Sequence, residues 1–210
     1  MRRRSLLPLA AAPLALLAGC AGFAPDKPQR PTLYDFGPLA DAPAAAPAGP
    51  PLVLGEVEAN AALDGTAMLY RLGYADARQL RPYALARWSA PPGQLLGQRL
   101  RHALGQVRPV LDPGQATGLA RASAAGLRML RVELEEFSHH FTSPQASQGV
   151  VRVRCTLLEN TAAGDRLLAQ RGFAAEHAAA SPDAPGGAQA LAAASQALAQ
   201  AVAAWISAQP

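Results

Sequence analysis

The chain has 210 residues, of which 50% are hydrophobic and 16% charged, and its formal net charge is +4 at pH 7. This length suits one ordinary domain plus a tether and is enough to bury a real core. Three of the positive charges are arginines at positions 2–4, so the remainder of the chain is nearly neutral. No later cluster of Lys and Arg with interleaved aromatic residues occurs, which argues against a nucleic-acid partner.

The first residues have the pattern of a secretory signal peptide. The three arginines precede an apolar stretch, residues 6–18, which is interrupted by prolines and is shorter than the ~20 residues that span a bilayer. Cys20 follows the run Leu-Ala-Gly, and this arrangement resembles the lipobox of bacterial lipoproteins. We therefore expect residues 1–19 to be removed and the Cys20 thiol to carry lipid, with palmitate among its acyl chains. The weaker alternative is a buried structural or catalytic cysteine.

Cys155 is the second of the two cysteines. If Cys20 carries lipid, no intrachain disulfide can form. Cys155 lies in an alternating apolar pattern, so we interpret it as an inert core thiol rather than a nucleophile.

The segment after the cysteine predicts a tether and then a folded domain. Residues 20–31 contain the lipidated cysteine and a proline-rich stretch typical of an extended linker. The domain is expected to span residues 32–210, beginning with a short strand at 32–36. Residues 40–51 are almost entirely Ala, Pro and Gly and predict a low-complexity loop.

Apolar patterning predicts the elements of the domain in chain order. Short apolar runs predict strands at 52–57, 67–72 and 83–88. A helix should begin after Ser89, with prolines in its first turn, and bury residues at steps of three and four. Residues 109–126 are expected to form a loop, with room for a short helical turn.

The second half alternates apolar and charged residues, which predicts half-buried strands. Strands are expected at 130–137, 151–157 and 167–175, and a final helix should carry an apolar stripe that ends near Trp205. The predicted fold is α+β: a single domain with a mainly antiparallel sheet covered by two principal helices.

No motif for catalysis, metal binding or cofactor binding is present. The sequence lacks a phosphate-binding glycine loop, HExxH, CxxC and Gly-x-Ser-x-Gly. His139 and His140 are interpreted as a surface pair at a strand end. Glu133 and Glu135 are placed on a solvent face, with arginines of the next strand as partners. We expect no catalytic residues, no metal and no cofactor, and therefore no enzyme.

Several segments together resemble the ABC-type transport auxiliary lipoproteins, the group that includes the PqiC-like proteins. The most specific is residues 83–92, with the pattern Tyr-x-x-x-Arg-Trp-x-x-Pro-Pro. Residues 33–38, Tyr70 with Arg71, residues 130–137 and the closing helix also fit. The resemblance covers about residues 17–207.

The resemblance implies a non-enzymatic docking component of an ABC transport system that moves lipid between the inner and outer membranes. Its expected partners are an ATPase, a permease and an MCE-domain protein, and the oligomeric state stays open, a homo-oligomer included. Ala21 and Gly22 offer no aspartate for inner-membrane retention, so we expect anchoring in the outer membrane, facing the periplasm. The alternative is a structural outer-membrane lipoprotein that assists another envelope or secretion complex.

Arg87 and Trp88 are the candidate partner-binding residues. Aromatic and arginine side chains are enriched in interface hot spots. The same residues could instead anchor packing where a strand turns into the first helix. The sequence leaves both roles open.

Overall fold

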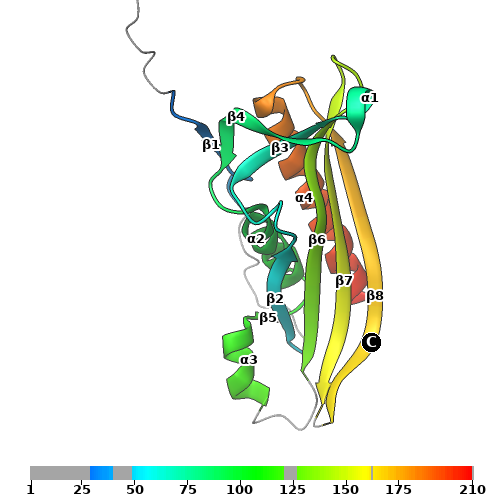
Figure 1. Ribbon diagram of the computed structural model, residues 1–210. Helices are drawn as coiled ribbons and strands as arrows, with labels where there is room; N and C mark the ends of the chain where they lie inside the picture. The colour runs from blue at the N-terminus through cyan, green and yellow to red at the C-terminus, as the bar shows by residue number, and fades with distance from the viewer. Residues whose placement is uncertain (1–28, 40–48, 121–126, 162, 210) are drawn as a thin grey trace, which may run out of the picture. The chain divides into compact units, whose positions relative to one another are not determined.

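The computed structural model describes residues 29–39, 49–120, 127–161 and 163–209. The contacts of the chain divide it after residue 30, and the elements named here belong to the unit of residues 31–210. Its described residues form a mixed sheet of eight strands with two main helices (Figure 1). The α+β class is therefore confirmed.

The elements agree with most of the expected positions. The strands are β1 (Thr32–Tyr34), β2 (Leu52–Ala59), β3 (Ala67–Leu72), β4 (Leu80–Trp88), β5 (Val110–Leu111), β6 (Arg128–Phe141), β7 (Ser147–Thr161) and β8 (Gly164–Ala178). The helices are α1 (Gly73–Asp76), α2 (Pro92–Gly105), α3 (Pro113–Ala120) and α4 (Ala184–Ser207). Residues 109–126 were expected to form a loop with room for a short helical turn. The structure places the two-residue strand β5 and the eight-residue helix α3 there, and Pro113 at the first helical position favours the helix start.

The sheet is built around β6, and its pairing corrects the prediction of a mainly antiparallel sheet. Four of the seven strand pairings among the described residues are parallel: β1 with β4, β2 with β5, β2 with β6, and β3 with β6. Antiparallel pairing is confined to β3 with β4 and to the successive strands β6, β7 and β8.

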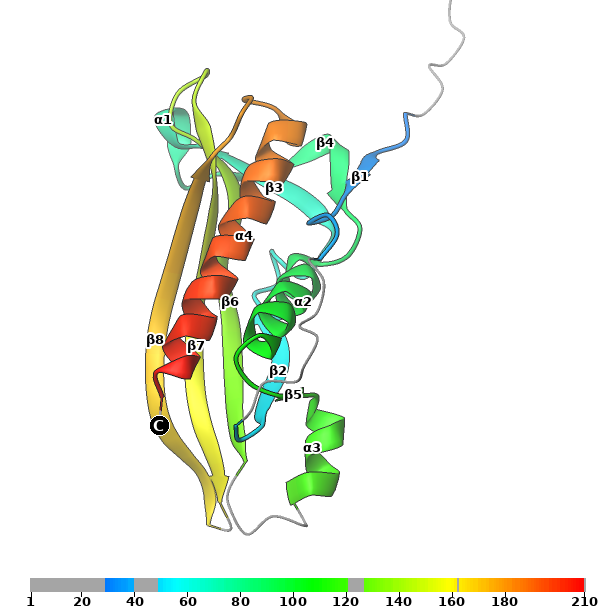
Figure 2. The ribbon, with the colours of Figure 1, turned by 180° about the vertical axis from the view of Figure 1, so that it is seen from behind.

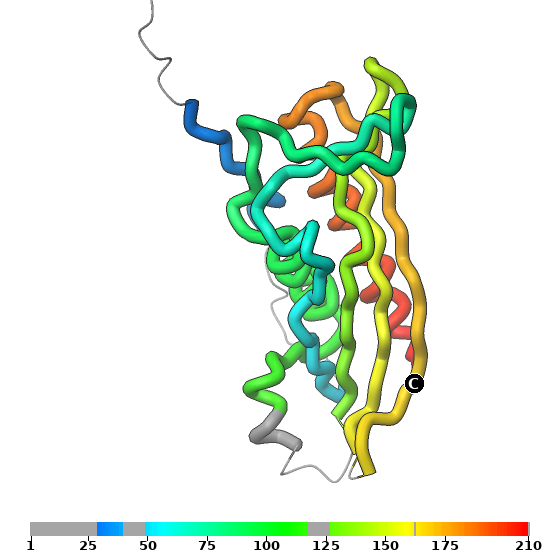
Figure 3. The backbone as a smooth tube through the Cα atoms, in the orientation of Figure 1, coloured from blue at the N-terminus to red at the C-terminus, as the bar shows by residue number. Residues whose placement is uncertain are grey.

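The two parallel pairings with β6 arise because β2 and β3 share one edge of that strand. β2 pairs with residues 128–134 of β6, and β3 pairs with residues 139–141 farther along. The chain thus continues in one direction from β2 to β3, as the tube in Figure 3 shows, instead of folding back as a hairpin. The sequence-based prediction assumed that strands adjacent in sequence also pair with each other.

A β-bulge in β6 changes which side chains face the core. Leu130, Val132 and Leu134 are buried, in the predicted alternation. The register with β7 shifts between Leu134 and Glu136, and an extra residue reverses the faces that follow it. Phe137 and His139 are buried as a result.

The two main helices cover the same face of the sheet (Figure 2). α4 packs against β6, β7, β8 and α2, and α2 packs against β2 and α4. Among the described residues, α4 is long and apolar enough to cross a membrane, but half of its most apolar window is buried in the domain, as in a core helix. Gly149 allows its close approach, because a Cβ there would lie 2.5 Å from the Leu191 nitrogen.

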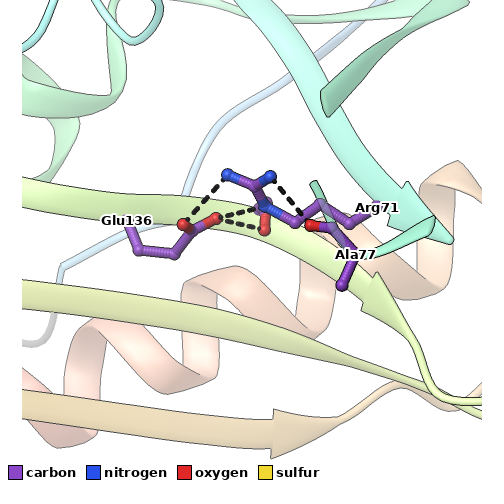
Figure 4. Close-up of polar contacts among 4 residues, drawn as sticks. Arg71, Ala77 and Glu136 are labelled. Carbon is purple, nitrogen blue, oxygen red and sulfur yellow. Dashed lines mark hydrogen bonds and ion pairs between the residues drawn. The ribbon is translucent and has the colours of Figure 1, made fainter. Parts of the chain in front are cut away.

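A polar clamp joins β3 to β6 on the opposite face (Figure 4). Arg71 donates from Nε and Nη2 to the two carboxylate oxygens of Glu136, at 3.1 and 3.2 Å. Its Nη1 donates to the Ala77 carbonyl oxygen at 3.2 Å, and the Ser138 hydroxyl donates to Glu136 at 2.6 Å. Such a bidentate arrangement fixes geometry as well as charge, so the clamp holds β3 in place at the end of β6.

Candidate docking site

The sequence-predicted lipid site, Cys20, lies outside the described residues. The first described residue after it is Gln29, in the proline-rich segment, and β1 begins three residues later.

Trp88 lies inside the core. Its side chain is 1% exposed, and its ring meets the rings of Phe36 and Phe137 edge to face, with centroids 5.6 and 5.4 Å apart. Of the two roles that the sequence left open for this residue, the structure places it in the packing role. In this structure the indole contributes almost no surface to a partner.

Arg87 is half-buried and turns back on its own strand. Its Nη1 donates to the carbonyl oxygens of Tyr83 and Ala86. Leu33 lies opposite Arg87 in the β1–β4 register, and Leu85 occupies the same face two residues before it. Leu33 and Leu85 are 67% and 47% exposed, so the surface beside Arg87 is apolar. Sequence reasoning missed both leucines, although their place in short predicted strands could have marked them.

The half-buried Tyr83 and the completely buried His139 form a pair under the start of α4. The Tyr83 hydroxyl is 2.8 Å from His139 Nδ1, and a Cβ added at Gly187 would lie 2.3 Å from the same nitrogen. Burial lowers the pKa of His139 to about 4 and raises the pKa of Tyr83 above its usual value. Both groups are therefore neutral at pH 7, and the prediction that His139 belongs to a surface pair was wrong.

Cys155 is completely buried in β7. Burial raises the pKa of its thiol to about 12. Because the thiolate is the nucleophilic form, burial and the raised pKa both disfavour reaction of this thiol at neutral pH.

A groove of about 890 Å³ runs along β2. Its lining comes from residues 54–57 and 59 of β2, from the turn at 63–64, from one face of α2 and from residues 112–114. Successive side chains of a strand point to opposite faces of the sheet. A lining that includes consecutive residues therefore follows the edge of β2 rather than one of its faces.

That edge is open over most of β2. On its outer side β5 pairs with Leu52 and Val53 only, and from Gly55 to Ala59 no described strand lies there. Gly93 and Gly97 lie on the side of α2 that faces β2, so the helix presents no side chain to the groove at these two positions. A Cβ at Gly93 would lie 2.9 Å from the Val57 carbonyl oxygen, and one at Gly97 would lie 3.6 Å from Val57 Cγ2.

The charges that line the groove are mainly acidic. Arg101 and Asp112 neutralise each other in an ion pair across it. Glu56 and Asp64 also line it, both are exposed, and neither forms an ion pair within the described part of the chain. The groove therefore carries two uncompensated negative charges. Its chemistry suits recognition of a polypeptide backbone and cationic side chains.

The groups that hold metal ions do not gather anywhere in the described residues. No cluster of three or more His, Cys, Asp or Glu side chains occurs among them. Glu135 is engaged by Arg154, whose Nε and Nη2 lie 2.9 and 2.6 Å from its carboxylate. This is the kind of cross-strand partnership that the sequence predicted for the acidic side chains of β6.

Comparison with known proteins agrees with this arrangement. Residues 33–203 match the family described as the ABC-type transport auxiliary lipoprotein component. The fold is similar to that of protein XCC0632 from Xanthomonas campestris, of family DUF330, with a TM-score of 0.67 and 17% identity over 83% of this chain and 94% of that one. It is also similar to the hypothetical protein CT253 from Chlamydia trachomatis, with a TM-score of 0.51 and 12% identity over 77% of this chain and 98% of that one.

No curated protein matches the chain. The two structural likenesses show the fold alone, whereas the family match extends from β1 to the last turns of α4. That extent includes β2, α2 and the groove between them, and the auxiliary role of the family implies a non-catalytic protein. The chain therefore belongs to the ABC-type transport auxiliary lipoprotein component family.

Proposed function

We propose that this lipoprotein is the docking component of an ABC transport system that moves lipid between the two membranes with an MCE-domain protein. Its lipid is carried on Cys20, it is anchored in the outer membrane, and its domain faces the periplasm. The family match supports the auxiliary role. The lipobox-like run before Cys20 and the lack of aspartate after it support the anchor.

The observation that carries the docking role is the open edge of β2 within its groove. Unpaired N–H and C=O groups along a strand edge are a template for pairing with another chain. Here they lie in a walled groove of about 890 Å³ rather than on a bare rim. The Arg87 side chain and the neighbouring Leu33 and Leu85 offer a second surface.

Photocrosslinking from the groove tests this function in native membranes. A photoreactive amino acid replaces Gln98, which lines the groove, and in a matched strain it replaces Gln106, which is exposed immediately after α2 and lies outside the lining. We expect a permease or an MCE-domain protein to be captured from position 98 and not from position 106. Capture of secretion or pilus components, with no permease or MCE-domain protein, would instead support the structural lipoprotein.

A further inference from the structure

We propose that the β2 groove binds an extended, basic segment of a partner protein, which adds to the sheet as a further strand beside β2. The inference rests on the proposed docking function and names the chemistry of the segment that docks. Strand addition of this kind draws affinity from main-chain hydrogen bonds and specificity from the side-chain sites that flank them.

The main chain of β2 provides the template. Val57, Glu58 and Ala59 pair with β6 on one side, and on the other side the described residues place no strand beyond the short contact with β5. Neighbouring strands lie about 4.8 Å apart. A strand added at that distance from the edge of β2 would lie in the groove, against the side of α2 that lines it.

Two glycines of α2, Gly93 and Gly97, line the groove and leave its helix side free of side chains at these positions. Gly97 has no side chain between α2 and the strand, and the nearest atom to a Cβ built there is Val57 Cγ2 at 3.6 Å. The space in front of Gly97 is part of the groove. A large side chain at this position would enter the space that the added strand needs.

The charge of the groove selects a cationic segment. Arg101 and Asp112 neutralise each other, which leaves the carboxylates of Glu56 and Asp64 facing the groove without a cationic partner among the described residues. Lysine or arginine side chains on the incoming segment would supply that partner, whereas acidic segments and phosphate headgroups would be repelled.

The same charges disfavour a second copy of the chain that pairs through its own β2. A two-fold pairing brings identical surfaces together, so Glu56 and Glu58 of one copy would lie near the same residues of the other. Like charges placed opposite each other across a strand pair are destabilising. A partner with the opposite charge is therefore the better occupant.

The binding test uses the full chain purified in detergent and two short fluorescent peptides. In one peptide valine alternates with lysine, and in the other valine alternates with glutamate. Fluorescence anisotropy should show binding of the lysine peptide and binding about tenfold weaker, or none, for the glutamate peptide. Equal binding of both peptides, or binding of neither, would overturn the proposal.

Two pairs of variants locate the binding. Gly97→Leu fills the groove, and Gly105→Leu makes the same change at the end of α2, where a Cβ meets no atom within 4 Å. Glu56→Lys with Asp64→Lys reverses the groove charge, and Glu176→Lys changes an exposed acid of β8 that lies outside the lining. We expect the groove variants to weaken lysine-peptide binding about tenfold or more, and the controls to keep it.

The variant Glu56→Lys with Asp64→Lys separates charge recognition from a loss of folding, because a folding defect would weaken binding of both peptides without exchanging the order of their affinities. It should prefer the glutamate peptide, with the order of the two affinities exchanged. An unchanged order of the two affinities, or equal losses in Glu176→Lys, would contradict the proposal. A wild-type dimer in sedimentation that Gly97→Leu dissociates would contradict it as well. The peptide assay tests the chemistry of the docked segment and needs no transport system. The photocrosslinking tests the docking function and does not depend on which segment binds, so the two proposals can fail separately.

Discussion

Lowering the pH from 7 to 4.5 should weaken the folded state through one imidazole, that of His139. The side chain is completely buried in β6. The Tyr83 hydroxyl is hydrogen-bonded to His139 Nδ1, and the ring of Tyr70 packs against the ring of Tyr83. Asp183 is the N-cap residue of α4. The negative charge of Asp183 favours protonation of His139, but the cost of burying the imidazolium is larger and lowers the pKa to about 4 from 6.5.

The sign of the effect follows from the two protonation equilibria. Between pH 6.5 and pH 4 the unfolded chain binds a proton at this residue and the folded chain does not, so the free energy of unfolding falls as the pH falls. The contribution is fully present above pH 6.5 and is lost on the way to pH 4. One pKa unit is equivalent to about 1.4 kcal/mol, and the loss between pH 7 and pH 4.5 is therefore about 2 kcal/mol.

Urea unfolding followed by circular dichroism at the two pH values measures this loss. His139→Gln keeps a group that can bond the Tyr83 hydroxyl but removes the titration, so its loss should be smaller than that of the wild type by about 2 kcal/mol. His177→Gln, at an exposed histidine of β8, should lose as much as the wild type. Equal losses in the wild type and His139→Gln would refute the reasoning.

Three further substitutions test the other residues singled out by the sequence. Trp88→Ala should lower the free energy of unfolding by about 3–5 kcal/mol, because it empties a closed aromatic cluster. Unchanged urea stability with lost crosslinking would show a partner contact instead. Cys155→Ala should cost only about 1 kcal/mol, and a thiol reagent should label the wild-type residue only after unfolding; labelling of the native protein would contradict its burial. Cys20→Ser should abolish palmitate incorporation, and normal incorporation would disprove the lipid site.

The buried positions of a strand could be predicted where apolar and charged residues alternate regularly. Leu130, Val132 and Leu134 alternate with charged residues, and the structure buries those three as expected. The alternation could not show the bulge that follows Leu134, because an extra residue leaves no compositional mark. His139 was therefore predicted to lie on the surface, although the bulge turns it into the core.

Whether two strands pair parallel or antiparallel could not be predicted from the local sequence pattern. The segment between β2 and β3, residues 60–66, is as short as a hairpin connection, and yet the two strands follow each other along β6. Their direction is decided by the pairing of residues far apart in sequence. A pattern of apolar residues specifies which face of a strand is buried, but it does not specify the neighbour.

The glycines of α2 show the same limit at the candidate site. Gly93 and Gly97 are four residues apart and share one helix face, which is a sequence signal for the close approach of another segment. Gly93 serves that approach, since a Cβ there would meet the Val57 carbonyl oxygen at 2.9 Å. Gly97, one turn later, is separated from the same strand by an ordinary contact distance and borders the groove. The two glycines look alike in sequence and both line the groove, but only Gly93 is needed for the close contact of α2 with Val57. The open edge, a property of the assembled sheet, is what turns a small residue on α2 into part of a binding surface.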